Sequence, residues 1–114
     1  DPRDIYCYAI EKDVKWIAHD SVDNYIQWYR NMLKKFNPGK VNMLVVPFEK
    51  LLTEYDTMIN KIESFTQIEA HHTDKFLNLD PRRSIKNVGI WKKSNLPQND
   101  FIRIENELKE LCYN

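Results

Sequence analysis

Glycine is the residue that this sequence most conspicuously lacks. The 114-residue chain has only two glycines, where an average usage of roughly 7% would give about eight. A loop that cradles phosphate with its backbone N–H groups needs several glycines, because the backbone must bend sharply and approach the ligand closely. The chain therefore does not contain a Gly-rich phosphate-binding loop of its own.

Long hydrophobic runs and an excess of charge are also missing. No apolar stretch approaches the roughly 18 residues that indicate a transmembrane helix, so we expect no membrane span. The 17 Lys and Arg residues balance 17 Asp and Glu residues. Because a general nucleic-acid binder neutralises phosphates with surplus Lys and Arg, we expect no nucleic-acid partner. The composition, 42% hydrophobic and 30% charged, is that of one folded globular domain.

Cysteine and histidine do not form a pattern typical of a metal site. Cys7 and Cys112 lie 105 positions apart, so we expect two free thiols and a reducing, cytoplasmic location. His71 and His72 are followed by Asp74. Adjacent histidines on a helix point about 100° apart, and no further cluster completes a tetrahedral site. The sequence therefore predicts no metal.

Apolar residues at helical spacing predict four helices. The first begins with Asp1 as a cap and Pro2 in the first turn, both of which favour a helix N-terminus. The second has the clearest amphipathic stripe and ends at an Asn-Pro-Gly sequence. The expected helices cover residues 1–11, 21–36, 53–66 and 100–113. Residues 70–93 are polar and read as a loop.

An almost unbroken apolar run, Val41–Val46, predicts one short strand. Strands of this kind are typical of parallel sheets that are covered on both faces. A single buried strand cannot pair its own N–H and C=O groups. We therefore expect its neighbours either in a second copy of the chain, as a homo-oligomer, or upstream in a longer protein.

Four stretches, in this order, resemble the C-terminal part of the cytosolic-type sulfotransferases. The first is similar to the end of that family's Arg-x-Pro-x-Asp segment, and the second to the aromatic helix that follows it. The third resembles a strand that leads into a helix, and the fourth a late loop with Gly-x-Trp-Lys. The stretches are Asp1–Ile5, Val22–Tyr29, Val41–Leu52 and Ser84–Lys92, and the segment Asp100–Tyr113 matches the terminal helix.

The resemblance implies an α/β fold. Residues 1–114 would be the C-terminal fragment of a single P-loop-like sulfotransferase domain, in which helices flank a parallel sheet. The chain itself would be mostly helical, with one short buried strand near residues 41–46. The phosphate-loop half would lie in the N-terminal part of the same protein, outside these residues.

The resemblance also implies an activity for the intact protein. Such enzymes transfer a sulfonate group from 3′-phosphoadenosine 5′-phosphosulfate to a hydroxyl or amine, and the acceptor would be a small molecule or a carbohydrate. No metal takes part. The family's catalytic His or Lys has no counterpart in this sequence, so we assign no catalytic residue and expect the chain alone to be inactive.

The residues implied in donor binding fall in the first and last of these stretches. Arg3 is the only side chain near the first helix with a bidentate donor fork for phosphate. Tyr8 stands where the family has a serine. The late loop offers one cation, two short polar side chains and backbone N–H groups near a glycine, which together suit an anion. The implied donor-binding residues are Arg3, Tyr8, Ser84, Lys86, Asn87 and Gly89.

Simpler interpretations stay open for the same residues. Residues 1–4 could only cap a helix, and residues 84–89 could be a solvated loop. Trp91 could pack beside an adenine or anchor its loop. Glu49, just after the expected strand, is more typical of a helix cap than of a catalytic acid. Four aromatic residues are expected mostly in the core, namely Trp16, Tyr25, Trp28 and Tyr29. The alternative to an enzyme is a non-enzymatic helical interaction module.

Overall fold

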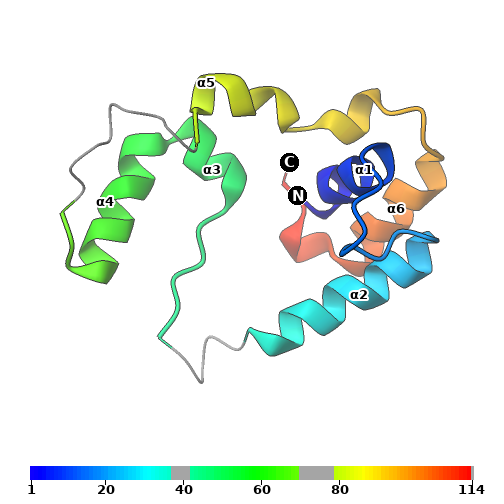
Figure 1. Ribbon diagram of the computed structural model, residues 1–114, viewed down its shortest axis with the longest axis horizontal. Helices are drawn as coiled ribbons and strands as arrows, with labels where there is room; N and C mark the ends of the chain where they lie inside the picture. The colour runs from blue at the N-terminus through cyan, green and yellow to red at the C-terminus, as the bar shows by residue number, and fades with distance from the viewer. Residues whose placement is uncertain (37–41, 70–78, 114) are drawn as a thin grey trace. The chain divides into compact units, whose positions relative to one another are not determined.

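A computed structural model describes residues 1–36, 42–69 and 79–113 of the chain. It divides into two compact units, the first formed by Asp1–Asn37 with Gly89–Asn114 and the second by Pro38–Val88. In both units, the described residues form helices joined by loops and turns (Figure 1).

Three helices build the first unit: α1 (Pro2–Glu11), α2 (Val22–Lys35) and α6 (Gln98–Glu107). Two short 3-10 helices, η2 (Ile90–Lys93) and η3 (Lys109–Leu111), flank α6 in sequence. The Asp1 side chain accepts the Arg3 N–H at the start of α1, and Ser21 accepts the Asn24 N–H at the start of α2. Both caps satisfy backbone donors that have no partner within the helix.

The core of the first unit lies where α1, α2 and α6 meet (Figure 1). The Tyr6 ring lies 4.9 Å from the Tyr25 ring, and the Tyr25 hydroxyl donates a 2.6 Å hydrogen bond to the Pro2 carbonyl. Each buried large apolar side chain stabilises the fold by roughly 1.5–3 kcal/mol relative to an exposed one. The buried core residues are Tyr6, Cys7, Ala9, Ile17, Tyr25, Ile26, Phe101, Ile104 and Leu108.

The second unit has a thinner core. It contains α3 (Phe48–Thr53), α4 (Tyr55–Thr66), α5 (Pro81–Ser84) and the 3-10 helix η1 (Ile85–Asn87). Helix α3 packs against α4, α5 and η1. Leu52 and Met58 are its buried apolar side chains among the described residues. The large apolar side chains that stay exposed are Val45, Phe48, Phe65, Ile68 and Ile85.

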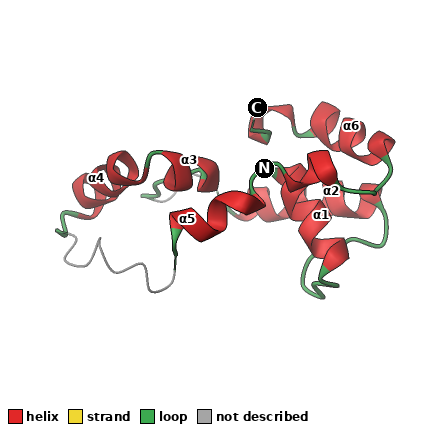
Figure 2. Ribbon diagram, turned by 90° about the horizontal axis from the view of Figure 1, so that it is seen from above, coloured by secondary structure: helices red, strands yellow, loops and turns green. Residues whose placement is uncertain are grey.

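The expected α/β fold is wrong for the part of the chain that the structure describes. Figure 2 shows helices and loops and no strand there, and residues 42–47 run as a loop. Val41 lies outside the described residues, and Val45 is 68% exposed rather than buried. The physical reason is that a strand needs a neighbouring strand to pair its N–H and C=O groups. No described segment pairs with residues 42–47.

The other expected elements differ mainly in their bounds. The helix expected at 53–66 is found as α4, Tyr55–Thr66, and a short helix that was not expected, α3, precedes it at Phe48–Thr53. In the region expected to be a loop, residues 79–93 form short helical turns, and residues 70–78 lie outside the described part. As expected, none of the helices in the described ranges is long and apolar enough to cross a membrane.

Candidate functional site

Asp4 joins the two ends of the first unit. Its carboxylate accepts the Gly89 N–H at 2.8 Å and the Trp91 N–H at 3.1 Å. Asp4 sits in the first turn of α1, and the N–H groups that donate to it come from a segment that begins 85 positions further along the chain. Hydrogen bonds from N–H groups to an ionised carboxylate are about twice as strong as neutral ones. The carboxylate therefore holds the Gly-x-Trp-Lys segment against α1.

Arg3 is buried beside Asp4 and is fully engaged in a network of its own. Its side chain is 2% exposed, as is that of Asp1, with which it forms a two-point ion pair through Nε at 3.0 Å and Nη2 at 2.7 Å. Nη1 donates to Glu105 at 3.1 Å and Nη2 to the Tyr113 carbonyl at 2.8 Å. The Asp1 carboxylate also accepts the Tyr113 N–H at 2.9 Å. The Arg3 fork thus holds α1 to the last described residues of the chain.

Trp91 anchors its loop. The Arg3 guanidinium carbon lies 4.2 Å from the centre of the Trp91 ring, within the range of a cation–π contact. The centre of the Phe101 ring lies 5.6 Å from that of Trp91. Trp91 is half-buried by these contacts. The geometry therefore favours the interpretation in which Trp91 anchors its loop.

The six predicted donor-binding residues divide between the two units. Arg3, Tyr8 and Gly89 belong to the first unit, and Gly89 has its N–H on Asp4. Tyr8 is 49% exposed on α1. The other three belong to the second unit, where Ser84 is half-buried and Lys86 and Asn87 are exposed. All six assignments stay predictions, and for Arg3 a direct ligand role would require new partners for Asp1 and Glu105.

Exposed cations accompany the Trp91 turn. Lys92 and Lys93 are exposed, and the Lys92 Nζ lies 5.8 Å from the centre of the Trp91 ring. Exposed positive charge on a turn whose indole is already packed in place can hold an anionic ligand by electrostatic attraction. It offers positioning rather than chemistry. No group of three or more His, Cys, Asp or Glu side chains suited to a metal ion occurs within the described ranges.

The thiols and the buried phenols of the first unit are held in their neutral forms. Cys7 and Cys112 are both free, as expected, and burial raises the pKa of each thiol. Burial also raises the pKa of Tyr6, with a further contribution from its hydrogen bond to Asp100. Burial is the main cause of the raised pKa of Tyr25. A nucleophilic cysteine needs a lowered pKa, so the geometry favours structural roles for these groups.

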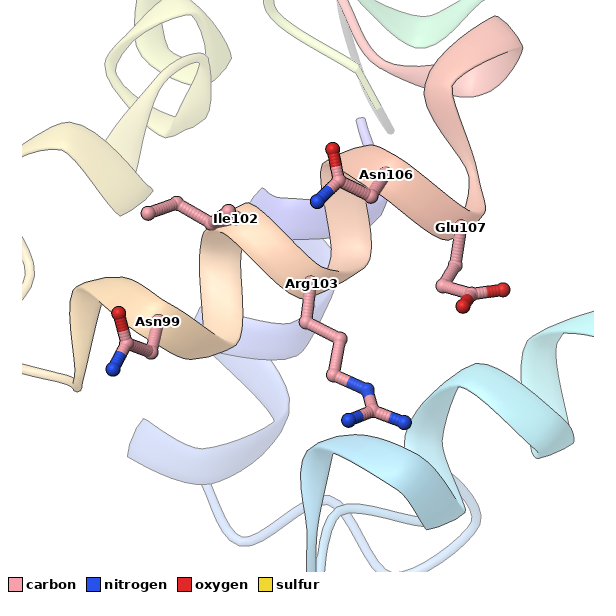
Figure 3. Close-up of a pocket in the computed structure, with 5 residues that line it drawn as sticks. All are labelled: Asn99, Ile102, Arg103, Asn106 and Glu107. Atoms are coloured by element: carbon pink, nitrogen blue, oxygen red, sulfur yellow. The ribbon is translucent and has the colours of Figure 1, made fainter.

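A depression on the outer side of α6 lies apart from these residues. Its volume is about 470 Å³, and all five residues that line it come from this one helix: Asn99, Ile102, Arg103, Asn106 and Glu107. Figure 3 shows Arg103 reaching toward α2, where it pairs with Asp23 at 2.7 Å. Glu107 pairs with Arg30, which also belongs to α2. Both charged groups are thus already compensated, and the depression is a surface feature between ion pairs.

Two features of the first unit could not be predicted from the sequence. Asp4 is expected only as a cap of its own helix, and no local signal indicates its bonds to residues 89 and 91. Trp16 is expected in the core, but its side chain is 74% exposed. His71, His72 and Asp74 lie outside the described residues, so the expectation about them stays a prediction. Glu49 is buried in the first turn of α3.

A scan against models of known protein families, a search of curated proteins and a search of solved structures each return no match to this chain.

Proposed function

We propose that this chain is part of a sulfotransferase and contributes to binding the 3′-phosphate and adenine end of 3′-phosphoadenosine 5′-phosphosulfate. One observation carries the proposal: the Asp4 carboxylate binds the Gly89 and Trp91 N–H groups. The resemblance assigns the Pro-x-Asp segment and the Gly-x-Trp-Lys loop to one end of one ligand. That they lie against each other, although 85 positions apart, supports a shared site.

Within this proposal, Arg3 and Asp4 are positioning residues. Their own partners are protein groups, so they fix the loop rather than touch the donor. The ligand would then meet the exposed side chains nearby, Tyr8 and Lys92. Prearranging a binding loop in this way lowers the ordering cost that the ligand must otherwise offset. Ser84, Lys86 and Asn87 belong to the second unit, and their part in donor binding stays a prediction.

A non-enzymatic interaction module is the second candidate, and a specific observation favours it. Five large apolar side chains are exposed in the second unit, with Val45 and Ile68 each at 68%. Among the described residues this unit buries only two apolar side chains, Leu52 and Met58, and apolar surface left exposed in this way suits contact with another protein. This candidate predicts no affinity for the nucleotide, which separates it cleanly from the first.

Titration calorimetry with adenosine 3′,5′-bisphosphate tests the proposal on the full 114-residue chain. Because only part of a donor site is present, we expect a Kd on the order of 1 mM, or about −4 kcal/mol. Adenosine 5′-monophosphate, which lacks the 3′-phosphate, should bind at least about tenfold more weakly, because it loses a charge-assisted contact of about 1.4 kcal/mol or more.

Paired variants show whether the Trp91 turn is responsible. Asp4→Asn releases the turn and should weaken binding of the bisphosphate, whereas Asp20→Asn, an exposed carboxylate of the same unit, should not. Equal affinity for the two nucleotides, or no heat above dilution at about 5 mM, a concentration that would half-saturate even a site of roughly −3 kcal/mol, would contradict the donor site.

A further inference from the structure

Trp16 is held at the surface by an ordered loop. Its side chain is 74% exposed, although tryptophan is usually buried. The loop between α1 and α2 is anchored on either side of it. The Val14 N–H donates to the Ala9 carbonyl at 3.0 Å, the Ile17 N–H donates to the Val14 carbonyl at 3.1 Å, and the Ile17 side chain is buried in the core. The position of Trp16 is therefore set by the fold.

A line of aromatic rings connects Trp16 to the core. Its ring centre lies 6.2 Å from that of Trp28, at an angle of 54°. Trp28 in turn stacks on the fully buried Tyr25, at 5.9 Å and 27°. The half-buried Trp28 and the exposed Trp16 thus form a rigid aromatic step on the surface, which we call the Trp16–Trp28 platform.

Amide side chains surround the platform on α2. Asn24 and Asn31 stand four residues before and three residues after Trp28, the spacings that place side chains next to each other on a helix. Gln27 donates a 3.0 Å hydrogen bond to Asn31. All three amides are exposed. Each carries both a donor and an acceptor and no charge, so together they suit a ligand rich in hydroxyl groups.

The charges beside Trp16 compensate each other. In the loop, Lys15 pairs with Asp13, and the His19 Nε2 lies 3.4 Å from the same carboxylate. The His19 Nδ1 lies 2.7 Å from the Ile17 carbonyl, which fixes the ring. A surface that binds anionic lipid needs clustered Lys and Arg, and a stable protein interface needs a broad apolar centre. The described residues beside the platform offer neither: Lys15 is paired with Asp13, and the amides of Asn24, Gln27 and Asn31 lie next to the rings.

We propose that the Trp16–Trp28 platform binds a neutral carbohydrate chain. The indole faces would stack on the apolar C–H faces of successive sugar rings, and the amides of Asn24, Gln27 and Asn31 would bond their hydroxyl groups. This stacking uses the same flat apolar faces by which aromatic side chains pack on other rings. The inference does not rest on the proposed function, since the platform binds without any nucleotide.

The three tryptophans of the chain allow a direct test by nuclear magnetic resonance. Each gives one indole N–H signal, and the full chain is titrated with cellohexaose, maltohexaose, mannohexaose and N-acetylchitohexaose. We expect at least one of these hexasaccharides to shift the Trp16 and Trp28 signals. The Trp91 ring contacts Arg3 and Phe101 instead, so its signal reports on the intact fold and should stay in place.

Two variants make the result decisive. Trp16→Ala should weaken binding at least about tenfold, as removal of a dominant aromatic contact does, and leave the Trp91 signal unchanged. Phe36→Ala removes another exposed aromatic ring of the same unit and should change affinity less than twofold. The inference is overturned if no hexasaccharide shifts the Trp16 signal, or if Trp16→Ala binds as the unchanged chain does. It is equally overturned if that signal responds only to protein dilution or to phosphatidylcholine–phosphatidylglycerol vesicles.

Discussion

Two neighbouring charged residues organise the first unit. Asp4 and Arg3 are both buried, and each bonds a group distant in sequence, while Arg3 also pairs with the neighbouring Asp1. A buried charge that loses its partner costs several kcal/mol, because it cannot return to water without disturbing the fold. These two residues are therefore where single substitutions should have their largest effects.

Replacing Asp4 by asparagine should lower the free energy of unfolding by about 2 kcal/mol, since the two N–H groups of residues 89 and 91 lose a charged acceptor. Urea denaturation measures the change. Asp20→Asn serves as the control and should stay within about 0.5 kcal/mol of the unchanged chain, as exposed substitutions do. An Asp4→Asn protein as stable as the control would mean that the two N–H groups do not depend on the carboxylate.

The stability of the first unit should fall at alkaline pH. The pKa values of Tyr6 and Tyr25 are raised above their ordinary value of 10.0 by burial. Above pH 10 the native state therefore keeps two protons that the unfolded chain releases. The contribution of the two phenols to the free energy of unfolding is complete below pH 10 and is lost as the pH rises above it. Tyr25→Phe removes one such group and should make the decline less steep by about 1.4 kcal/mol per pH unit. Denaturation at a series of pH values above 10 measures how steeply the free energy of unfolding falls with pH in each protein. Equal slopes for Tyr25→Phe and the unchanged chain would contradict a raised pKa of Tyr25.

At the scale of elements, the sequence predicts the first two helices closely, but its prediction of a strand is wrong for the described residues. The helix of residues 1–11 is found as Pro2–Glu11 and that of residues 21–36 as Val22–Lys35, because caps and apolar spacing are local signals. An apolar run such as residues 41–46 indicates a buried strand only where a neighbouring strand is present to pair with it. The helix expected at 100–113 ends earlier, at Glu107, and continues as η3.

Gly89 should be required by the backbone at the start of η2. Its φ is +73°, in the left-handed region, while a Cβ there would meet only the Lys92 side chain, at 3.8 Å. The cost of Gly89→Ala is therefore strain and not a clash, about 1–2 kcal/mol. Gly89→Asn should cost less, because asparagine tolerates this region. Thermal unfolding ranks the two variants, and an alanine variant more stable than the asparagine one would contradict this reasoning.

At the scale of the whole molecule, the predicted site residues are divided between the two units: Arg3, Tyr8 and Gly89 belong to the first, and Ser84, Lys86 and Asn87 belong to the second. The resemblance could name residues of both segments, because motifs are contiguous in sequence. It could not show that Asp4 binds residues 89 and 91, since a contact across 85 positions depends on the fold of α1 against α6. Nor could it show that Trp16 is exposed, because aromatic residues at helical spacing usually indicate a core.

Our main proposal is that the start of α1 and the Trp91 turn form one surface for the donor's phosphate and adenine. Its most direct test is the backbone amide spectrum of the full chain during titration with adenosine 3′,5′-bisphosphate. We expect the signals of Tyr8, Gly89, Trp91 and Lys92 to shift together and to saturate with one affinity. If the bisphosphate leaves these four signals unmoved while it binds elsewhere, or does not bind at all, the claim is contradicted.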